Sequence, residues 1–338
     1  MSFAGVTGAL RWLRARKRIL RVVVVIAALL LAGAIYQILS SAADERANPP
    51  PGTLVDMGGY RLHLYCTGQG SPTVVLVGGA GDFWAIWDPI QRSIAESTRV
   101  CSYDRPGLGS SDSHPVMSPT ADAHVTMLHQ LLQNAQEEGP YIVVGHSIGG
   151  LIARKFAGNY PQETVGVVLV DSSVEGQFLA LPSSIIESNQ SAGAIYSICQ
   201  VLAPFGVVRL LGLGDARAGA FPVLSEEAQA AIAAAFHQTR GCTALRAEGA
   251  MADEPLTKGG PPVQLGDIPL IVITGNLVDV EQNPSLQWMQ DIWLDIQAGL
   301  LQRSTNSTWV VAERSSHYVH TDEPELVIQE IRSLLPGN

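Results

Sequence analysis

Short apolar runs recur along this chain at intervals that suit the strands of one buried sheet. A strand whose successive residues are all apolar is buried on both faces, as in a parallel sheet covered by helices. Gly58-Gly59 separates two further runs and predicts a hairpin turn, since glycine readily takes positive φ. The predicted strands are TLVDM at 53–57, YRLHLYC at 60–66, TVVLV at 73–77, RVCSY at 99–103, YIVVG at 141–145, VGVVLV at 165–170, LIVIT at 270–274 and TWVVA at 308–312.

Stretches with helical spacing separate most of these runs, such as the one in which Val125 and Leu128 recur. Strands that alternate with helices predict an α/β fold whose mostly parallel sheet carries helices on both faces. The alternation stops from 174 to 266, where helix-like stretches occur without a strong strand. We therefore expect a folded core made of 53–173 and 267–338, with 174–266 inserted as a helical cap or lid.

The residues from Val22 to Ala43 carry no charge. As a helix they would extend about 33 Å, enough to cross the hydrocarbon core of a bilayer. Six Lys or Arg residues precede them within 1–21, and no acidic residue does. Such a basic cluster stays cytoplasmic by the positive-inside rule. We expect a single-pass transmembrane anchor at 22–43, a proline-rich linker at 44–52 and a body outside the cytoplasm.

A cleavable signal peptide is the alternative for the same segment. Ser41-Ala42-Ala43 has the small residues of a cleavage site, although the apolar stretch exceeds the roughly 7–15 residues of a typical signal. Cleavage would make the body a secreted protein. After Ala43 the chain has 15 basic and 31 acidic residues, a net charge of −16. A body this acidic argues against nucleic acid as a partner, and no obligate protein partner is evident.

Four cysteines, Cys66, Cys101, Cys199 and Cys242, stand in the part of the chain expected outside the cytosol, where thiols tend to pair. None of them has the C-x-x-C spacing of a zinc or redox site, which favours structural disulfides. Four cysteines allow three pairings, and the residues alone leave the pairing open.

Gly145-His146-Ser147-Ile148-Gly149 stands between the apolar run YIVV and the helix-like stretch GLIARKFA. This is the context in which a G-x-S-x-G turn presents a serine hydroxyl above a sheet. The helix behind the turn supplies free N–H groups and the positive end of its dipole. We therefore predict Ser147 as a nucleophile, the alternative being an ordinary glycine-rich turn.

A serine hydroxyl needs a base to take its proton, and neutral imidazole with a pKa of about 6.5 suits this role. His317 follows the last predicted strand by a short loop and is the predicted base, with His320 as the near alternative. His146, next to the serine, is expected to pack or hydrogen-bond beneath the turn.

The imidazole in turn needs a carboxylate to hold its tautomer. Asp279 comes shortly after LIVIT and a glycine, between the cap and His317, and is the preferred acid. Asp171 ends the run VVLV and is the alternative acid, although the ordinary role of an Asp there is to cap the following turn. For the developing oxyanion we expect two backbone N–H donors, those of Ile148 and of Ala80 in the turn Gly-Gly-Ala-Gly at 78–81. This chemistry requires neither a metal nor a cofactor.

Together these residues make the chain resemble the α/β-hydrolase superfamily, in particular its lid-bearing branch of esterases, haloperoxidase-like and prolyl-aminopeptidase-like proteins. The resemblance covers about 53–335. Besides the serine turn it rests on YDRPGLGSSD at 103–112, which is similar to the branch's D-R-x-G-x-G-x-S signature. The branch often has His-Gly at the oxyanion turn and a glycine before its catalytic histidine, where this chain has Gly78 and Ser316.

The resemblance implies acyl transfer to water, with a carboxylic ester as the leading substrate class. An amide or an N-terminal proline peptide is the second class, and a non-catalytic binding protein that retains the fold is the alternative outside enzymes. Serine as the nucleophile argues against relatives that use aspartate there, such as epoxide hydrolases. In this fold Cys66 and Cys101 lie on neighbouring strands, which implies that they pair and that Cys199 pairs with Cys242 in the cap.

Overall fold

The apolar runs form the strands of one eight-stranded sheet in the order β1-β2-β4-β3-β5-β6-β7-β8. The computed structural model describes residues 3–115, 120–181, 183–258, 261–276 and 287–337. Strand β2 runs antiparallel to β1 and β4, and the remaining neighbours are parallel. The strands are β1 (Thr53–Asp56), β2 (Arg61–Thr67), β3 (Thr73–Val77), β4 (Val100–Tyr103), β5 (Tyr141–His146), β6 (Thr164–Val170), β7 (Leu270–Gly275) and β8 (Ser307–Ala312). The predicted α/β architecture is confirmed.

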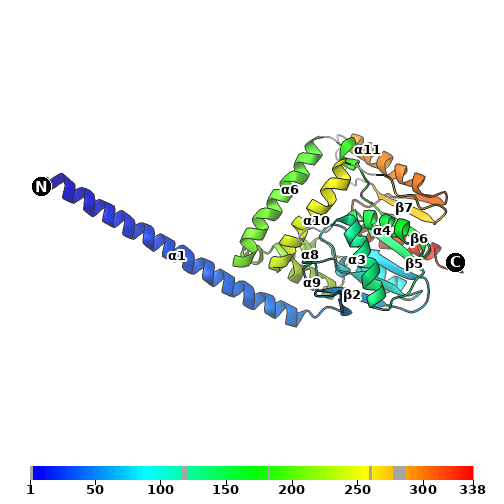
Figure 1. Ribbon diagram of the computed structural model, residues 1–338, viewed down its shortest axis with the longest axis horizontal. Coiled ribbons are helices and arrows are strands. Elements are labelled where there is room, and N and C mark those ends of the chain that lie inside the picture. Colours follow the sequence, from blue (N-terminus) through cyan, green and yellow to red (C-terminus); the bar gives the residue numbers. More distant parts are fainter. Residues whose placement is uncertain (1–2, 116–119, 182, 259–260, 277–286, 338) are drawn as a thin grey trace.

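Helices connect the strands and cover both faces of the sheet (Figure 1). The helices of the core are η1 (Trp84–Trp87), α2 (Asp88–Ile94), α3 (Ala121–Asn134), α4 (Ile148–Asn159), α11 (Gln287–Ala298), η5 (Gly299–Arg303), α12 (Val319–Asp322) and α13 (Pro324–Ser333).

Alternate side chains of the central strands enter two separate apolar clusters. In β3, Val74 and Leu76 join the cluster that contains residues of η1, α2 and α13, whereas Val75 and Val77 join the cluster that contains residues of α3 and α4. Side chains alternate across a strand, so a continuously apolar strand can fill both layers at once. This explains why the parallel strands read as unbroken apolar runs.

Between β6 and β7 the described residues form helices and no strand. These elements, here called the cap, are α5 (Gln177–Ala180), α6 (Ser183–Leu202), η2 (Ala203–Phe205), α7 (Val207–Leu210), α8 (Leu213–Gly219), α9 (Glu226–His237) and α10 (Thr239–Lys258). A disulfide between Cys199 and Cys242 joins α6 to α10.

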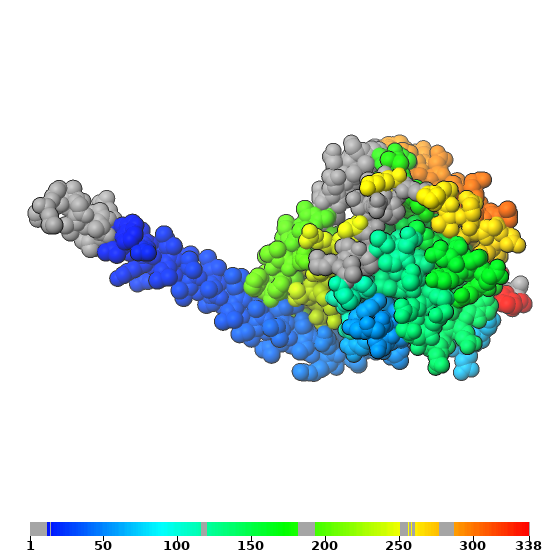
Figure 2. Space-filling view, viewed as in Figure 1, coloured from blue at the N-terminus to red at the C-terminus, as the bar shows by residue number. Residues whose placement is uncertain are grey.

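The N-terminal segment is one continuous helix, α1 (Phe3–Ala47), which projects from the body (Figures 1 and 2). By length and composition it could cross a membrane. The helix extends beyond the apolar stretch and through 44–47, which the sequence placed in the linker. An ion pair of 2.6 Å between Asp44 and Arg209 of α7 holds this last turn against the cap, which accounts for the shorter linker.

Cys66 and Cys101 are register partners on β2 and β4 and form the second disulfide. A bridge between strands restricts the unfolded chain, and loss of a native disulfide typically costs about 2–5 kcal/mol. We expect the Cys66→Ser/Cys101→Ser double variant to show a free energy of unfolding lower by that amount in urea titrations. Equal stability of the variant and the unreduced parent, or free thiols in peptide maps, would contradict the pairing.

Candidate active site

The serine turn joins β5 to α4 and is strained at the serine itself. Ser147 has φ 53° and ψ −125°, a backbone conformation that costs energy for a residue with a Cβ atom. The turn is also tight, because a Cβ atom at Gly149 would lie 2.3 Å from the carbonyl oxygen of Val77. Strain of this kind is typical of a serine that a strand–turn–helix elbow presents at the carboxyl edge of a sheet.

His317 and Asp171 form a hydrogen-bonded pair at the same edge. Nδ1 of His317 lies 2.6 Å from Oδ2 of Asp171, which directly follows β6. The other oxygen, Oδ1, accepts hydrogen bonds from the N–H of Gly275 at 2.9 Å and from Nε1 of Trp293 at 2.8 Å. The carboxylate partner of the imidazole is therefore Asp171, the alternative acid. Asp279, the preferred acid, lies outside the described residues.

Two opposing effects act on the His317 imidazole. Desolvation by the surrounding protein lowers its pKa, but the hydrogen bond to Asp171 and the negative charges of Asp171 and Asp82 outweigh it. The net result is a pKa above the ordinary value for histidine. A carboxylate that accepts the proton of Nδ1 leaves Nε2 with its lone pair available, the form that a general base requires.

His146 and His320 occupy buried positions behind this pair. Nε2 of His146 donates to the carbonyl oxygen of His317 at 2.9 Å, so the residue before the nucleophile holds the backbone of the base. The His320 ring is fully buried and lies 4.5 Å from the ring of Trp87. Burial, together with the nearby His146 and His317, places its pKa well below the ordinary value. The side chain of His317, by contrast, is 46% exposed and accessible to a substrate.

A buried arginine forms hydrogen bonds to the backbone of the expected oxyanion turn. Nη1 of Arg105 donates to the carbonyl oxygen of Gly78 at 2.6 Å, and Nη2 donates to that of Gly79. A trans peptide is planar, so a carbonyl and the N–H that follows it point in opposite directions. With the Gly79 carbonyl turned toward Arg105, the N–H of Ala80 points away from the guanidinium.

Glu248 of the cap completes this arrangement. Its carboxylate pairs with Nε of Arg105 and accepts a hydrogen bond from the N–H of Gly81. The N–H of Gly81 is thereby engaged and cannot serve as a donor to substrate. Ile148 offers the other expected donor, because it is the first residue of α4 and the first N–H groups of a helix lack a partner within it.

Among the residues that the structure describes, two groups of side chains have the composition of a metal site. Asp82, His146 and His320 offer ligand atoms within 4.8 Å of one another. The Arg217 guanidinium already lies 3.3 Å from Asp82, and Nδ1 of His146 lies 3.3 Å from the same carboxylate. A positive guanidinium beside Asp82 opposes the binding of a cation there.

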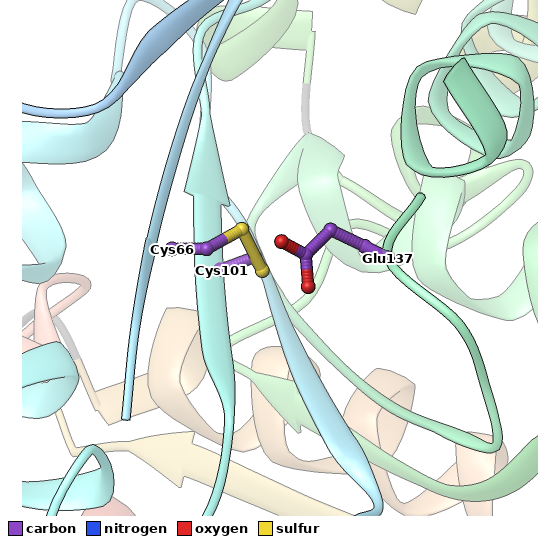
Figure 3. Close-up of side chains that lie close together, drawn as sticks. All are labelled: Cys66, Cys101 and Glu137. Atoms are coloured by element: carbon purple, nitrogen blue, oxygen red, sulfur yellow. A yellow bond between two sulfur atoms is a disulfide. The ribbon is translucent and has the colours of Figure 1, made fainter. Parts of the chain in front are cut away.

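Figure 3 shows the other group, Cys66, Cys101 and Glu137. Metal ligation requires thiolates, and the two sulfur atoms are bonded to each other. The Glu137 carboxylate pairs with the guanidinium of Arg99. This group is a strand-bridging disulfide beside a surface ion pair rather than a metal site.

A cavity of about 360 Å³ opens beside the His317–Asp171 pair. Apolar side chains contribute to its wall, including Leu181, which follows α5, and Met289 and Trp293 of α11. The sequence analysis missed Arg105, Glu248 and Trp293. Arg105 belongs to the DRPGLG signature and could have been found there, whereas nothing in the sequence pointed to the other two.

Comparisons with known proteins agree with this fold. A family model described as "Alpha/beta hydrolase family" matches residues 74–330. The AB hydrolase superfamily protein of Gibberella zeae is 26% identical over 282 residues, which cover 78% of this chain and 86% of the relative. The solved structure of the epoxide hydrolase CorEH has a TM-score of 0.58 at 20% identity and covers 83% of this chain and 97% of that chain. A thermophilic esterase from Thermogutta terrifontis has a TM-score of 0.56 at 21% identity and covers 84% and 97%. With the family model spanning β3 to α13, the chain belongs to the alpha/beta hydrolase family.

Proposed function

We propose that the protein is a serine hydrolase that cleaves carboxylic esters through an acyl-enzyme on Ser147, with His317 as base and Asp171 as its acid partner. The observation that carries this proposal is the 2.6 Å contact between His317 Nδ1 and Asp171 Oδ2 at the sheet edge where the strained Ser147 stands. The esterase among the structural neighbours agrees with an ester substrate.

In the first half-reaction Oγ of Ser147 attacks the ester carbonyl while Nε2 of His317 takes its proton. The carbonyl oxygen becomes negative and accepts hydrogen bonds from the N–H groups of Ile148 and Ala80. As the intermediate collapses, the ester C–O bond breaks and His317 gives the proton to the departing alcohol. Ser147 then carries the acyl group.

In the second half-reaction water attacks the acyl-enzyme, and His317 takes a proton from that water. The bond between Ser147 Oγ and the acyl carbon breaks, and His317 returns the proton to Oγ, which releases the carboxylic acid. Asp171 stabilises the imidazolium in both halves without taking the proton itself. No cofactor takes part.

A fluorophosphonate probe tests this function, because it reacts covalently with an activated serine. Purified full-length protein should be labelled, and peptide mapping should place the label on Ser147. The Ser147→Ala variant should not be labelled, whereas Ser173→Ala, a buried serine nearby, should be labelled like the parent. Absence of labelling in folded parent protein would contradict the serine-hydrolase proposal.

The raised pKa of His317 makes a prediction about pH. The base must be neutral to take a proton, so kcat/KM should rise with pH along an acidic limb centred above the ordinary histidine value of 6.5. Asp171→Asn removes the hydrogen bond and charge that raise this pKa, so its residual activity should have a limb at lower pH. A parent limb at or below 6.5, or a limb that Asp171→Asn leaves in place, would contradict the pairing.

We also propose that α1 anchors the protein in a membrane with its basic N-terminus in the cytoplasm and its catalytic body outside. An epitope placed after Asn338 should be digested by protease added to intact spheroplasts, whereas one before Phe3 should be protected. Retention of the protein in the membrane after a carbonate wash is expected of an anchor. Soluble protein beginning near Asp44 would instead establish a cleaved signal.

A further inference from the structure

The cap exposes a concentrated apolar surface that the proposed function does not explain. Large apolar side chains between 37% and 71% exposed follow one another along the end of α6, α7 and the start of α8. They form what we call the cap patch: Ile195, Ile198, Val201, Leu202, Leu210, Leu211 and Leu213. Contiguous exposed apolar surface of this kind marks a site of interaction with a partner or a membrane.

The segment that carries the cap patch is almost free of charge. From Gly193 to Leu213 the sequence contains a single residue that is charged at neutral pH, Arg209. Its guanidinium lies 2.6 Å from the carboxylate of Asp44 on α1. Leaving water therefore exposes no unpaired charge in this segment, which is the condition for placing it in an apolar medium.

The cap patch adjoins the outer half of the apolar helix α1. A Cβ atom at Gly33 would lie 2.5 Å from the carbonyl oxygen of Phe205, so a larger residue could not support this close approach of α1 to η2. Four residues further on, Nε2 of the buried Gln37 donates to the carbonyl oxygen of His237 at 2.6 Å. In Figure 1, one end of α6 approaches the C-terminal half of α1, and Figure 2 shows the cap packed against that part of α1.

These contacts set the depth of the cap if 22–43 crosses the bilayer. Gly33 lies about 15 Å along the helix from Ala43, roughly half the hydrocarbon thickness. Elements that touch α1 between Gly33 and Asp44 are then level with the outer leaflet rather than above it. The cap patch, on α7 and on the adjoining ends of α6 and α8, then meets acyl chains and not water.

An apolar cavity of about 150 Å³ lies between the cap patch and the turn that follows β3. Ile195 and Leu213 belong both to the cap patch and to the wall of this cavity. At its inner end the wall includes Gly81, the residue after the expected oxyanion donor Ala80. The cavity wall contains no charged residue. A hydrocarbon chain could lie here with its carbonyl group at the oxyanion turn.

We propose that the cap patch is immersed in the outer leaflet and that the enzyme draws a long-chain acyl ester sideways out of the membrane into this cavity. The inference rests on the proposed ester hydrolysis and on α1 as an anchor, and it specifies the substrate class as a membrane-dissolved lipid ester. A short, water-soluble ester needs neither the cap patch nor the length of the cavity.

Immersion can be measured without any turnover. A bimane label on Leu211→Cys, in full-length protein reconstituted in phosphatidylcholine vesicles, should be quenched by lipids that carry a nitroxide on the acyl chain. The same label on Val165→Cys, an exposed position at the start of β6, should not be quenched. Equal quenching at the two positions, or none at Leu211, would overturn the immersion of the cap patch even if ester hydrolysis is confirmed.

Substrate entry is tested by comparing two esters with the same reconstituted protein. Ile198→Asp and Leu211→Asp place charges in the apolar layer and should lower hydrolysis of a diacylglycerol held in the vesicles about tenfold or more. Hydrolysis of p-nitrophenyl butyrate in the surrounding water should change less than about twofold, since these variants leave the reaction centre intact. The control variant Val165→Asp should leave both rates near the parent values.

Cavity length is tested by Ala235→Trp, which adds bulk to the cavity wall. The chain length at which kcat/KM is highest should become shorter in this variant. Lateral entry would be overturned if Ile198→Asp and Leu211→Asp lost activity equally on both esters or lost it on neither. An unchanged chain-length optimum in Ala235→Trp would also overturn it. A parent protein inactive on both esters would instead refute the proposed ester hydrolysis.

Discussion

Ser147→Ala and His317→Ala should each lower kcat on a soluble ester by on the order of 10⁴–10⁶-fold, and the double variant should be hardly worse than either. The serine cannot attack without the base, and the base has no proton to take without the serine, so removing one removes the contribution of both. Steady-state kinetics on the purified variants measure the effect, with active-site titration of the parent to fix its concentration. Losses that multiply in the double variant would show that the two residues do not act as a unit.

His320→Gln is the matched control for the base. His320 lies three residues from His317, but it is fully buried against Trp87, and its ring is displaced from the exposed edge. The variant should retain turnover to within about an order of magnitude once folding is verified by circular dichroism, because its effect is on packing. An inactive His320→Gln beside an active His317→Gln would transfer the role of the base to His320.

The sheet was predictable because local sequence determines most of it. A strand buried on both faces must be apolar throughout, and β3, β5, β6 and β7 each show this as an unbroken run. The serine turn was predictable for a related reason, since the close approach of Gly149 to Val77 excludes any side chain at the glycine. Both constraints are visible in a short stretch of sequence, as an apolar run in the strands and as a glycine two residues after the serine in the turn.

The acid depends on contacts that the sequence does not display. The Asp171 carboxylate is hydrogen-bonded to Gly275 of β7, to Trp293 of α11 and to His317 in the loop after β8. All three partners lie more than a hundred residues further along the chain. The φ of Asp171, 42°, is also unusual for a residue other than glycine, and no feature of the neighbouring sequence predicted it. The packing of α1 on the cap was equally hidden, because Gly33 and Phe205 become neighbours only in the folded chain.

Asp171→Asn should lower kcat by about 10⁴-fold, whereas Asp279→Asn should leave it near the parent value. An amide at 171 can donate a hydrogen bond to Nδ1 of His317, which stabilises the tautomer whose Nε2 carries the proton and cannot act as base. In a serine protease this substitution costs about 10⁴ in turnover while the geometry stays intact. The comparison is made on soluble ester at a pH above the limb of the parent.

The two substitutions must be distinguished from damage to the fold. Oδ1 of Asp171 accepts hydrogen bonds from the N–H of Gly275 and from Nε1 of Trp293, and the carbonyl oxygen of an asparagine can still accept both. Asp171→Asn should therefore melt close to the parent and still react slowly with a fluorophosphonate, whereas Asp171→Ala should lose stability as well as activity. If Asp279→Asn is inactive and Asp171→Asn is active in folded protein, the carboxylate that serves His317 during turnover comes from the segment after β7.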